Sequence, residues 1–150
     1  LKEKQIVRKF VICNLRICQL NELNNIGIMP EIVQVERHPL NTFQSEMAFC
    51  KSNGIDVQDY SPLCKMHERL RNNPELIKMA ERHGKNIGQI ILRWHIDTGA
   101  TPIFTSTKPA RVKLYSEIFD FTLSEDEVRT ISSLNCNHKL YLESLVCPGF

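Results

Sequence analysis

The stretch VQDYSPL, residues Val57–Leu63, carries the signal from which the fold can be worked out. It follows KSNGID, in which Gly54 is typical of the end of a helix, and it runs into a tyrosine, a serine and a chain-breaking proline. A strand that follows a helix is therefore predicted to stop at Tyr60. The ring at that end is either core packing that lies late in the strand or a flat surface offered to a planar ligand.

Helix-like and strand-like segments alternate in both directions from this stretch. One helix is defined at both ends, because Asn73 can cap it, Pro74 suits its first turn and Gly84 can end it. Strands are predicted at residues 9–14, 31–36, 55–61 and 101–106. Helices are predicted around residues 18–23 and at 42–54, 73–84, 86–99 and 108–119, with Thr42 capping the second, and a capping box of Ser124 and Glu127 opens a last one.

Strands that alternate with helices pair in parallel and are joined by right-handed crossovers. Two architectures have this pattern, a doubly wound open sheet and a (β/α) barrel. No G-x-G-x-x-G follows any predicted strand, so the main signature of the dinucleotide-binding open sheet is missing. In a barrel, ligand groups gather just past the strand ends. Polar or aromatic residues occupy that position after all four strands: Asn14, Gln34, Tyr60 with Ser61, and Thr105 with Ser106.

The composition excludes several classes of protein. The chain has 150 residues, 42% of them hydrophobic and 24% charged, which is ordinary for a globular protein with one core. A net charge of +2 without basic runs gives no reason to expect nucleic acid as a partner. No apolar stretch approaches the roughly 20 residues that cross a bilayer, and the charged opening LKEKQIVRKF is not a secretory signal. Because the chain starts on a leucine, within what reads as helix, we expect a piece of a longer protein.

The six cysteines and five histidines form no recognisable metal or disulfide pattern. The cysteines lie at positions 13, 18, 50, 64, 136 and 147, with no C-x-x-C pair. Reduced thiols in a cytoplasmic protein are therefore predicted. The histidines include no i, i+4 pair, so no metal site is expected, and His38 and His95 are interpreted as structural.

Five short sequences, in their order and spacing, resemble the second half of the aldo-keto reductases: VICN, VQVERHP, DYSPL, LRWHIDTG and IFTSTKPARV. FDFTLSEDEV resembles that family's penultimate helix, and the tail HKLYLESLVCPGF resembles its C-terminal loop beside the substrate pocket. The resemblance implies an α/β fold, the second half of a (β/α)8 TIM-type barrel with about four parallel strands and crossover helices. Residues 1–150 would then be the C-terminal half of a single barrel domain whose N-terminal half is absent.

The resemblance also implies an oxidoreductase that binds NADP(H) in extended form and moves hydride between it and a small carbonyl compound. In the family, the tyrosine that Tyr60 matches stacks on the nicotinamide ring. Asn14 and Gln34 match the residues that hold the carboxamide. These residue types suit the task, because a cationic ring gains from an aromatic face and an amide needs both a donor and an acceptor.

Four further residues match the part of the family's site that binds phosphates. Ser61 and Leu63 match positions that approach the pyrophosphate. Ser106 and Arg111 match positions that bind the adenosine 2′-phosphate, and the planar fork of an arginine suits such a group.

The sequence departs from the family's pattern at several of these positions. Cys13 stands in place of the usual serine before Asn14, and Cys64 in place of the usual glycine after YSPL. Thr105 replaces a lysine beside the 2′-phosphate, and Tyr115 replaces an asparagine near the adenine. Cys13 and Thr105 are still counted among the cofactor-binding candidates. The expected cofactor is NADP, and because of these departures NAD is kept as a second candidate.

Three of the cofactor-binding assignments have a structural alternative. Tyr60 can be a residue that only packs over the core. Gln34 can be an interior residue whose hydrogen bonds are made by its neighbours, and Arg111 can be a solvated charge on a helix. Trp94 is interpreted as packing between helix and barrel.

No catalytic residue is assigned within this chain. In the family, the catalytic aspartate, tyrosine, lysine and histidine come from the first half of the barrel, which has no counterpart here. An enzyme whose other half completes the site is one interpretation. A non-catalytic nucleotide-binding or scaffold relative is the alternative. Exposed edges of a half-barrel predict that it associates with itself or with the missing half.

Overall fold

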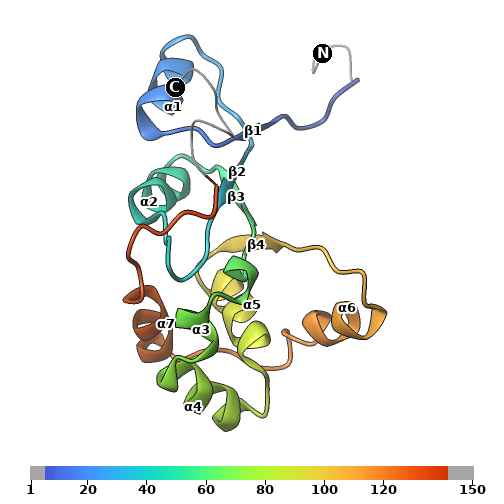
Figure 1. Ribbon diagram of the computed structural model, residues 1–150. Coiled ribbons are helices and arrows are strands. Elements are labelled where there is room, and N and C mark those ends of the chain that lie inside the picture. Colours follow the sequence, from blue (N-terminus) through green and yellow to red (C-terminus); the bar gives the residue numbers. More distant parts are fainter. Residues whose placement is uncertain (1–5, 142–150) are drawn as a thin grey trace. The chain divides into compact units, whose positions relative to one another are not determined.

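The computed structural model describes residues 6–141 (Figure 1). Cys147 and most of the C-terminal tail discussed above lie outside the described residues. The chain divides into two compact units, each described by itself below. Unit 1 contains residues 6–35, residues 43–58 and Tyr141, and unit 2 contains residues 36–42 and 59–140.

Four strands form one sheet in the order in which they occur in the chain, and they run parallel, as the alternation of strands and helices predicts. In the register of the first pair, Val11 lies opposite Ile32 and Cys13 opposite Gln34. The strands are β1 (Val11–Cys13), β2 (Ile32–Glu36), β3 (Asp56–Tyr60) and β4 (Ala100–Ile103).

The helices predicted from residue 18 onwards are all present, whereas residues 6–8, part of the opening that reads as helix, are not helical. Asn73 caps α4 by accepting from the backbone N–H groups of Glu75 and Leu76, and Gly84 ends it at φ 62°. Ser124 and Glu127 form the predicted capping box of α7. The helices are α1 (Ile17–Asn25), α2 (Gln44–Ser52), α3 (Glu68–Arg71), α4 (Pro74–His83), α5 (Ile87–Asp97), α6 (Pro109–Ser116) and α7 (Glu125–Ser132), with a 3₁₀ turn, η1 (Cys64–Met66), before α3.

Two details of the sequence prediction are wrong. Thr42 does not cap α2, because Phe43 occupies the cap position in a left-handed conformation with φ 53°. Both backbone groups of Thr42 are used elsewhere: its carbonyl accepts from Arg37 Nε at 2.9 Å and its N–H donates to Asn135 Oδ1 at 3.2 Å. The fourth strand ends at Ile103, so residues 104–106 form a loop.

Unit 1 buries a small set of apolar side chains from its strands and helices. Successive residues of a strand point to opposite faces, and Val33 and Val35 are accordingly buried on either side of the half-buried Gln34. Its buried apolar residues are Leu20, Val33, Val35, Cys50, Ile55 and Val57.

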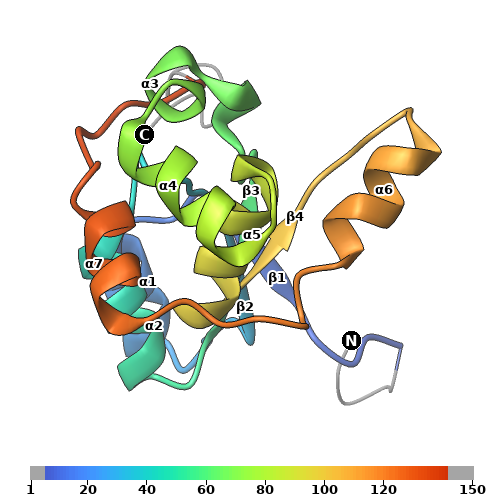
Figure 2. The same cartoon turned by 90° about the horizontal axis from the view of Figure 1, so that it is seen from below.

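Unit 2 has its own core, built mainly by the contacts of α4, α5 and α7 (Figures 1 and 2). Trp94 is fully buried in this core and donates its indole N–H to Ser132 Oγ at 3.0 Å, so the interpretation of Trp94 as packing is confirmed. By contrast, α6 buries none of its residues and lies at the end of an extended segment after β4 (Figure 2). The core consists of Leu40, Cys64, Leu70, Leu76, Met79, Ala80, Ile90, Ile91, Trp94, Leu123 and Ile131.

Two further observations concern the described part of the chain. Between residues 6 and 141, no helix is long and apolar enough to cross a bilayer. The five cysteines in this range are free thiols, with Cys50 and Cys64 buried and Cys13, Cys18 and Cys136 exposed.

Candidate functional site

In unit 1, the first two strands bring three of the predicted residues together, although Gln34 lies in the middle of β2 and not past its end as predicted. Cys13 ends β1 opposite Gln34, and its thiol lies 3.9 Å from Gln34 Oε1. Asn14 follows in a left-handed conformation with φ 60°, and its N–H donates to the Gln34 carbonyl at 2.9 Å. A thiol is a weak donor, so the amide oxygen of Gln34 keeps acceptor capacity for a stronger one.

The sequence analysis did not anticipate the partner of the Gln34 amide nitrogen. Gln34 Nε2 donates to Gln58 Oε1 on the neighbouring strand at 3.1 Å, and both residues belong to unit 1. This bond fixes which end of the Gln34 amide is the donor and which is the acceptor. The sequence did contain a signal for this bond, because the glutamine of VQDYSPL, Gln58, lies in the next predicted strand after that of Gln34.

In unit 2, Tyr60 ends β3 and is half-buried, and a tight turn follows it. Ser61 has φ 51°, and its carbonyl accepts from Cys64 N–H at 2.8 Å. Leu63 packs against the core of unit 2. The tyrosine, serine and leucine predicted to contact a cofactor therefore lie on one short, hydrogen-bonded turn.

The next residues continue in a conformation that L-amino acids rarely adopt. Cys64, Lys65 and Met66 have φ values of 47°, 49° and 53°. A left-handed backbone suits glycine, which has no Cβ. Cys64 is nevertheless fully buried, and burial raises the pKa of its thiol to about 11.

The predicted 2′-phosphate residues follow β4 in unit 2. Thr105 is exposed, and Ser106 Oγ accepts from Lys108 N–H at 3.2 Å, which shapes the loop before α6. Arg111 lies on α6 and is exposed. The loop therefore offers a hydroxyl, α6 offers a solvated cation, and Lys108 adds a second cation close in sequence.

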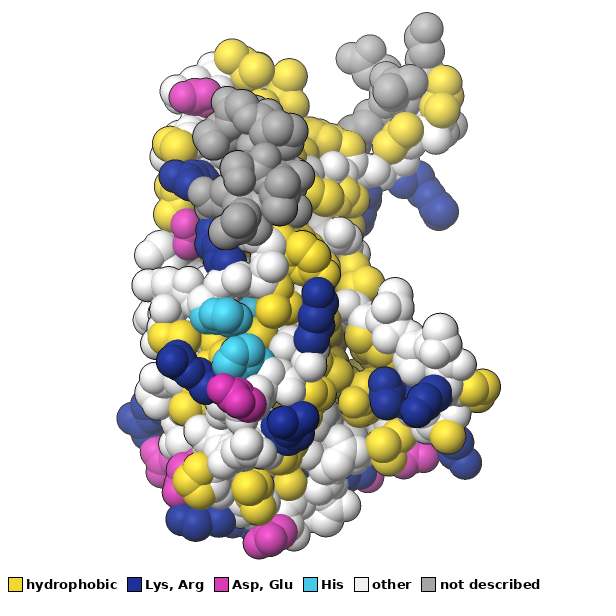
Figure 3. All heavy atoms as spheres, in the orientation of Figure 1, with side chains coloured by type: hydrophobic (Ala, Val, Ile, Leu, Met, Phe, Trp, Pro, Cys, Tyr) yellow, Lys and Arg dark blue, Asp and Glu magenta, His cyan; other side chains and the backbone are white. Residues whose placement is uncertain are grey.

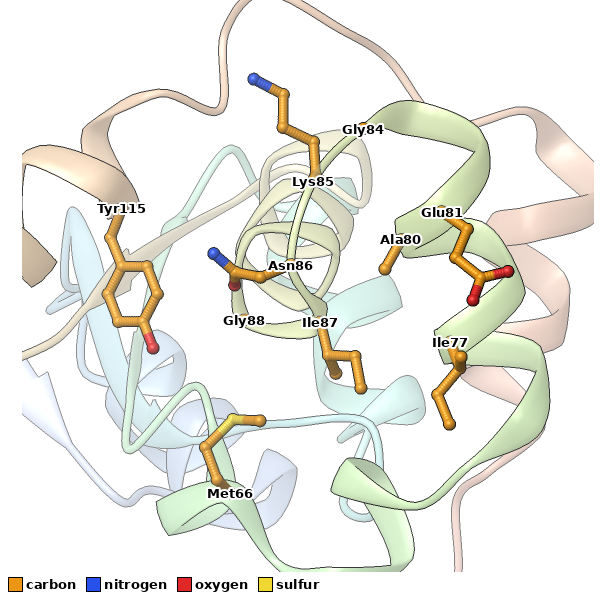
Figure 4. A pocket seen from close by; sticks show the side chains of 10 residues that line it. All are labelled: Met66, Ile77, Ala80, Glu81, Gly84, Lys85, Asn86, Ile87, Gly88 and Tyr115. Carbon is orange, nitrogen blue, oxygen red and sulfur yellow. The ribbon is translucent and has the colours of Figure 1, made fainter.

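Unit 2 also contains a pocket of about 470 Å³ that the sequence analysis did not anticipate (Figure 4). Tyr115 reaches it from α6, and the Tyr115 ring and hydroxyl lie only 2.9 Å from where a Cβ on Gly88 would be. Lys85 points away from the hollow in Figure 4 and pairs with Asp120 at 2.7 Å. The walls are mostly apolar, with lining residues Met66, Ile77, Ala80, Glu81, Gly84, Lys85, Asn86, Ile87, Gly88 and Tyr115.

The sequence analysis also missed a cluster of buried ionisable side chains in unit 2. Arg37 Nη1 donates to Asp59 Oδ2 at 2.8 Å, and the same oxygen lies 2.5 Å from His95 Nδ1. Burial lowers the pKa values of Arg37 and His95, and the contact with Asp59 opposes that effect in both. The signal was a charged residue directly after β2, another within the apolar strand β3, and a histidine on the apolar face of α5. His95 has hydrogen-bonding contacts at both ring nitrogens, which fits its structural interpretation.

Histidine side chains gather near the middle of one face of the molecule (Figure 3). The rings of His67 and His138 are 4.9 Å apart, and those of His38 and His138 are 6.4 Å apart. Within residues 6–141, however, no group of three histidine, cysteine or acidic side chains could hold a metal ion. His38 Nε2 instead contacts Glu36 Oε1 at 3.0 Å.

Parallel strands joined by helices, with polar groups just past the strand ends, define the class of protein as an α/β protein of the (β/α)-barrel type. A family model described as the Aldo/keto reductase family matches residues 1–136. The chain belongs to this family, and the predicted resemblance is confirmed.

Individual relatives agree with this assignment. The chain is 33% identical over 141 residues to a methylglyoxal reductase from Yersinia pestis, covering 93% of this chain and 51% of the relative. It is 35% identical over 135 residues to a glyoxal reductase from Bacillus subtilis, covering 89% of this chain and 48% of the relative. The chain thus spans about half the length of these relatives.

Solved structures show the same relation. An aldo-keto reductase from a Medee basin deep-sea metagenome library superimposes with a TM-score of 0.88 at 31% identity, covering 94% of this chain and 53% of that one. An aldo-keto reductase from Bombyx mori in complex with NADP superimposes with a TM-score of 0.87 at 34% identity, covering 95% of this chain and 50% of that one. The fold is therefore half of an aldo-keto reductase barrel, as predicted.

Proposed function

We propose that this chain supplies the cofactor-binding half of an NADP(H)-dependent aldo-keto reductase that interconverts a carbonyl compound and its alcohol. The observation that carries the proposal is the family match over residues 1–136, together with a relative of the same fold that binds NADP. When bound, the cofactor supplies the hydride, and the protein binds and orients it.

The residues predicted to contact the nicotinamide suit it in their chemistry. The Gln34 oxygen can accept from a carboxamide, and the Asn14 side chain carries both donor and acceptor atoms. The Tyr60 ring offers an aromatic face to the cationic form of the ring. Cys13 beside Gln34 is a weaker partner than a hydroxyl, so we propose that Asn14, Gln34 and Tyr60 make the main contacts.

We propose that the phosphates and the adenosine bind to residues of unit 2. Ser61 and Leu63 would approach the pyrophosphate, and Thr105, Ser106 and Arg111 the 2′-phosphate. Support comes from the pocket of about 470 Å³ whose wall includes Tyr115, because Tyr115 lies one helical turn from Arg111 on α6. An apolar pocket beside an arginine suits a flat base that carries a phosphate.

The cofactor we propose is NADP(H), with NAD(H) bound more weakly. Thr105 contributes no charge to the 2′-phosphate, so Arg111 is left as the principal cation there. The substrate we propose is a small carbonyl compound, which the names of the methylglyoxal and glyoxal reductases support.

We further propose that residues 1–150 are the C-terminal half of one barrel domain in the cytoplasm. The proton donor would come from the other half, and its strands would pair with the edges that this half presents. The five cysteines of the described residues are free thiols, and two of them, Cys50 and Cys64, are buried as small apolar residues, which supports a reducing compartment.

The test is calorimetric titration of NADP⁺ into the longest natural polypeptide that contains this chain. Tyr60→Ala should raise the Kd roughly tenfold, because a partly desolvated cation–π contact is worth about 1–2 kcal/mol. Phe119→Ala is the control, since Phe119 is 71% exposed. Unchanged affinity in a folded Tyr60→Ala variant, or no binding by the unaltered protein, would overturn the proposal. Residues 1–150 alone should not reduce an aldehyde.

A non-catalytic nucleotide-binding or scaffold protein is the second candidate. It is favoured by the weak contact of 3.9 Å between the Cys13 thiol and Gln34, and by the exposed Thr105 where a cation would serve better. Sequencing the region upstream of this chain separates the two candidates. An intact catalytic set of aspartate, tyrosine, lysine and histidine there favours the enzyme, and its loss favours the scaffold.

A further inference from the structure

Unit 2 contains a buried charge cluster, which consists of Arg37, Asp59 and His95. Arg37 is 3% exposed, and Asp59 and His95 are fully buried. Asp59 Oδ2 is contacted by both partners, whereas Asp59 Oδ1 has no hydrogen-bond partner among the described residues. Removing charges from water is costly, and an apolar core of the same volume is often as stable or more stable. Stability therefore gives no reason for this cluster.

The cluster holds the chain on both sides of Tyr60. On the near side, the Asp59 carboxylate is held by Arg37 at 2.8 Å. The Tyr60 carbonyl accepts from the backbone N–H of Arg37 at 3.4 Å. On the far side, the Pro62 carbonyl accepts from His95 Nε2 at 3.0 Å. Together with the 2.5 Å contact between Asp59 Oδ2 and His95 Nδ1, residues 59–62 are thus attached at four points to Arg37 and His95.

Arg37 is itself fixed from several directions. Its Nε donates to the Thr42 carbonyl and its Nη2 to Thr98 Oγ1, each at 2.9 Å. Its guanidinium carbon lies 4.1 Å from the centre of the Trp94 ring. Because Trp94 and Thr98 belong to α5 and its C-terminal cap, the cluster ties the turn after β3 to the most buried helix of unit 2.

The turn needs such support because its backbone is unfavourable. Ser61 has φ 51°, a conformation that a residue with a Cβ adopts only when its surroundings impose it. Hydrogen bonds from fixed donors have defined directions, which apolar packing lacks. The directional bonds of Arg37 and His95 end on the residues that flank Tyr60 and Ser61.

We propose that Arg37 and His95 are positioning residues, which hold the Tyr60–Ser61 turn in the geometry that binds the cofactor. This inference rests on the proposed function, in which Tyr60 faces the nicotinamide and Ser61 approaches the pyrophosphate. Neither positioning residue touches the cofactor. Their effect on affinity passes through the backbone of residues 59–62.

The test replaces the whole cluster at once, in the longest natural polypeptide that contains this chain. In the triple variant Arg37→Met, Asp59→Leu, His95→Leu, no charge is left buried without a partner, so the variant is expected to unfold at the same or a higher denaturant concentration. The Kd for NADP⁺ is nevertheless expected to rise about tenfold. Amide hydrogen exchange at Ser61 and Leu63, measured without cofactor, is expected to become at least tenfold faster, as local opening becomes easier.

A second variant and a matched control complete the test. His95→Gln, made with Arg37 and Asp59 intact, keeps one donor that can reach the Pro62 carbonyl. Compared with His95→Leu, it should bind NADP⁺ more tightly and protect the amides of Ser61 and Leu63 better against hydrogen exchange. The control is Arg93→Met with Asp97→Leu, which removes an ion pair of 2.6 Å from the same helix. It should leave exchange at Ser61 and Leu63 unchanged.

The outcomes separate this inference from the function on which it rests. If the unaltered protein binds no NADP⁺, the proposed function fails, and hydrogen exchange alone decides whether the cluster positions the turn. If the folded triple variant keeps both the exchange rates and the affinity of the unaltered protein, the cluster is only a structural element and the inference is overturned. If the triple variant fails to fold, His95→Gln is compared with His95→Leu. Equal exchange rates and equal affinity in these two variants would then overturn the inference.

Discussion

At the scale of single residues, the conformation of Cys64 and its burial favour different side chains. The left-handed φ of 47° favours glycine, whereas the surrounding core accommodates the buried sulfur. The sequence analysis marked Cys64 as a departure from a family glycine. The structure gives that departure a physical meaning, since glycine relieves strain at such a position and the larger side chain fills space.

The first prediction concerns the reactivity of this thiol. Because burial raises the pKa of Cys64 to about 11, the thiol stays protonated at neutral pH, and only the thiolate reacts with alkylating reagents. Iodoacetamide should therefore label Cys13 and Cys18 at pH 7.5, while Cys64 stays unlabelled in the folded protein. Peptide mass spectrometry after a time course measures this. Rapid labelling of Cys64 before unfolding would contradict the burial described here.

A second prediction at this scale concerns Arg111. If its guanidinium binds the 2′-phosphate, Arg111→Ala should weaken NADP⁺ binding about tenfold, since charge-assisted hydrogen bonds are worth roughly 1.5–3 kcal/mol. Binding of NAD⁺, which lacks that phosphate, should not change. Lys113→Ala on the same helix is the matched control. Equal loss for both cofactors would mean that Arg111 acts on something other than the 2′-phosphate.

At the scale of elements, α5 and α6 of unit 2 meet through a glycine and a tyrosine. Gln89 of α5 donates to the carbonyls of Leu114 and Glu117 at 2.9 and 3.0 Å, and beside it Tyr115 packs directly on Gly88. Tyr115 also makes a T-shaped contact with Phe104, at 5.3 Å between ring centres, which helps to hold the ring in place. The shape of the pocket therefore depends on the absence of a side chain at position 88.

The third prediction follows from this close approach. In Gly88→Ala, the new Cβ would lie 2.9 Å from the Tyr115 ring, so the ring must move. A side-chain end can move at little cost, and alanine favours a helix over glycine by about 1 kcal/mol, so the unfolding midpoint should change little. The NADP⁺ Kd of Gly88→Ala should nevertheless change. When Gly88→Ala is introduced together with Tyr115→Ala, the part of that change caused by the clash with the tyrosine ring should disappear. A thermodynamic cycle of the four proteins gives the coupling.

At the scale of the whole molecule, the sheet has two terminal strands, β1 and β4. Apolar side chains on them are exposed, Val11 by 44% and Ile103 by 38%. Unpaired strand edges with exposed apolar groups tend to pair with other chains. In a complete barrel these edges are closed by further strands, which is the arrangement we propose for the natural protein.

The fourth prediction is that residues 1–150, produced alone, associate with themselves. Sedimentation velocity should give a weight-average mass that rises with protein concentration. Val11→Lys places a charge on one terminal strand and should reduce the association, since lysine on an edge opposes pairing. A compact monomer at all concentrations would show that the edges are protected in another way.

Local patterns along the chain were enough to predict the order of the strands and helices and most of their ends. Asn73, Gly84 and Ser124 act on backbone groups within a few residues, so a local pattern contains all the information that each cap needs. The ordered motifs also predicted the family and the half-barrel fold, and they indicated Asn14 and Gln34, which the structure joins by a backbone hydrogen bond between the end of β1 and the middle of β2. The role of both residues in cofactor binding stays a prediction.

Which distant side chains meet could be learned only from the folded structure. Arg37 and Asp59 are 22 residues apart, and Asp59 and His95 are 36 apart, so no local pattern could join them into one cluster. The misplaced cap of α2 has the same origin, because the backbone groups of Thr42 bond to Arg37 and Asn135, and Asn135 is 93 residues away. Local hydrogen bonds depend on neighbours in sequence, whereas the pairing of buried polar groups depends on which elements the core packs together.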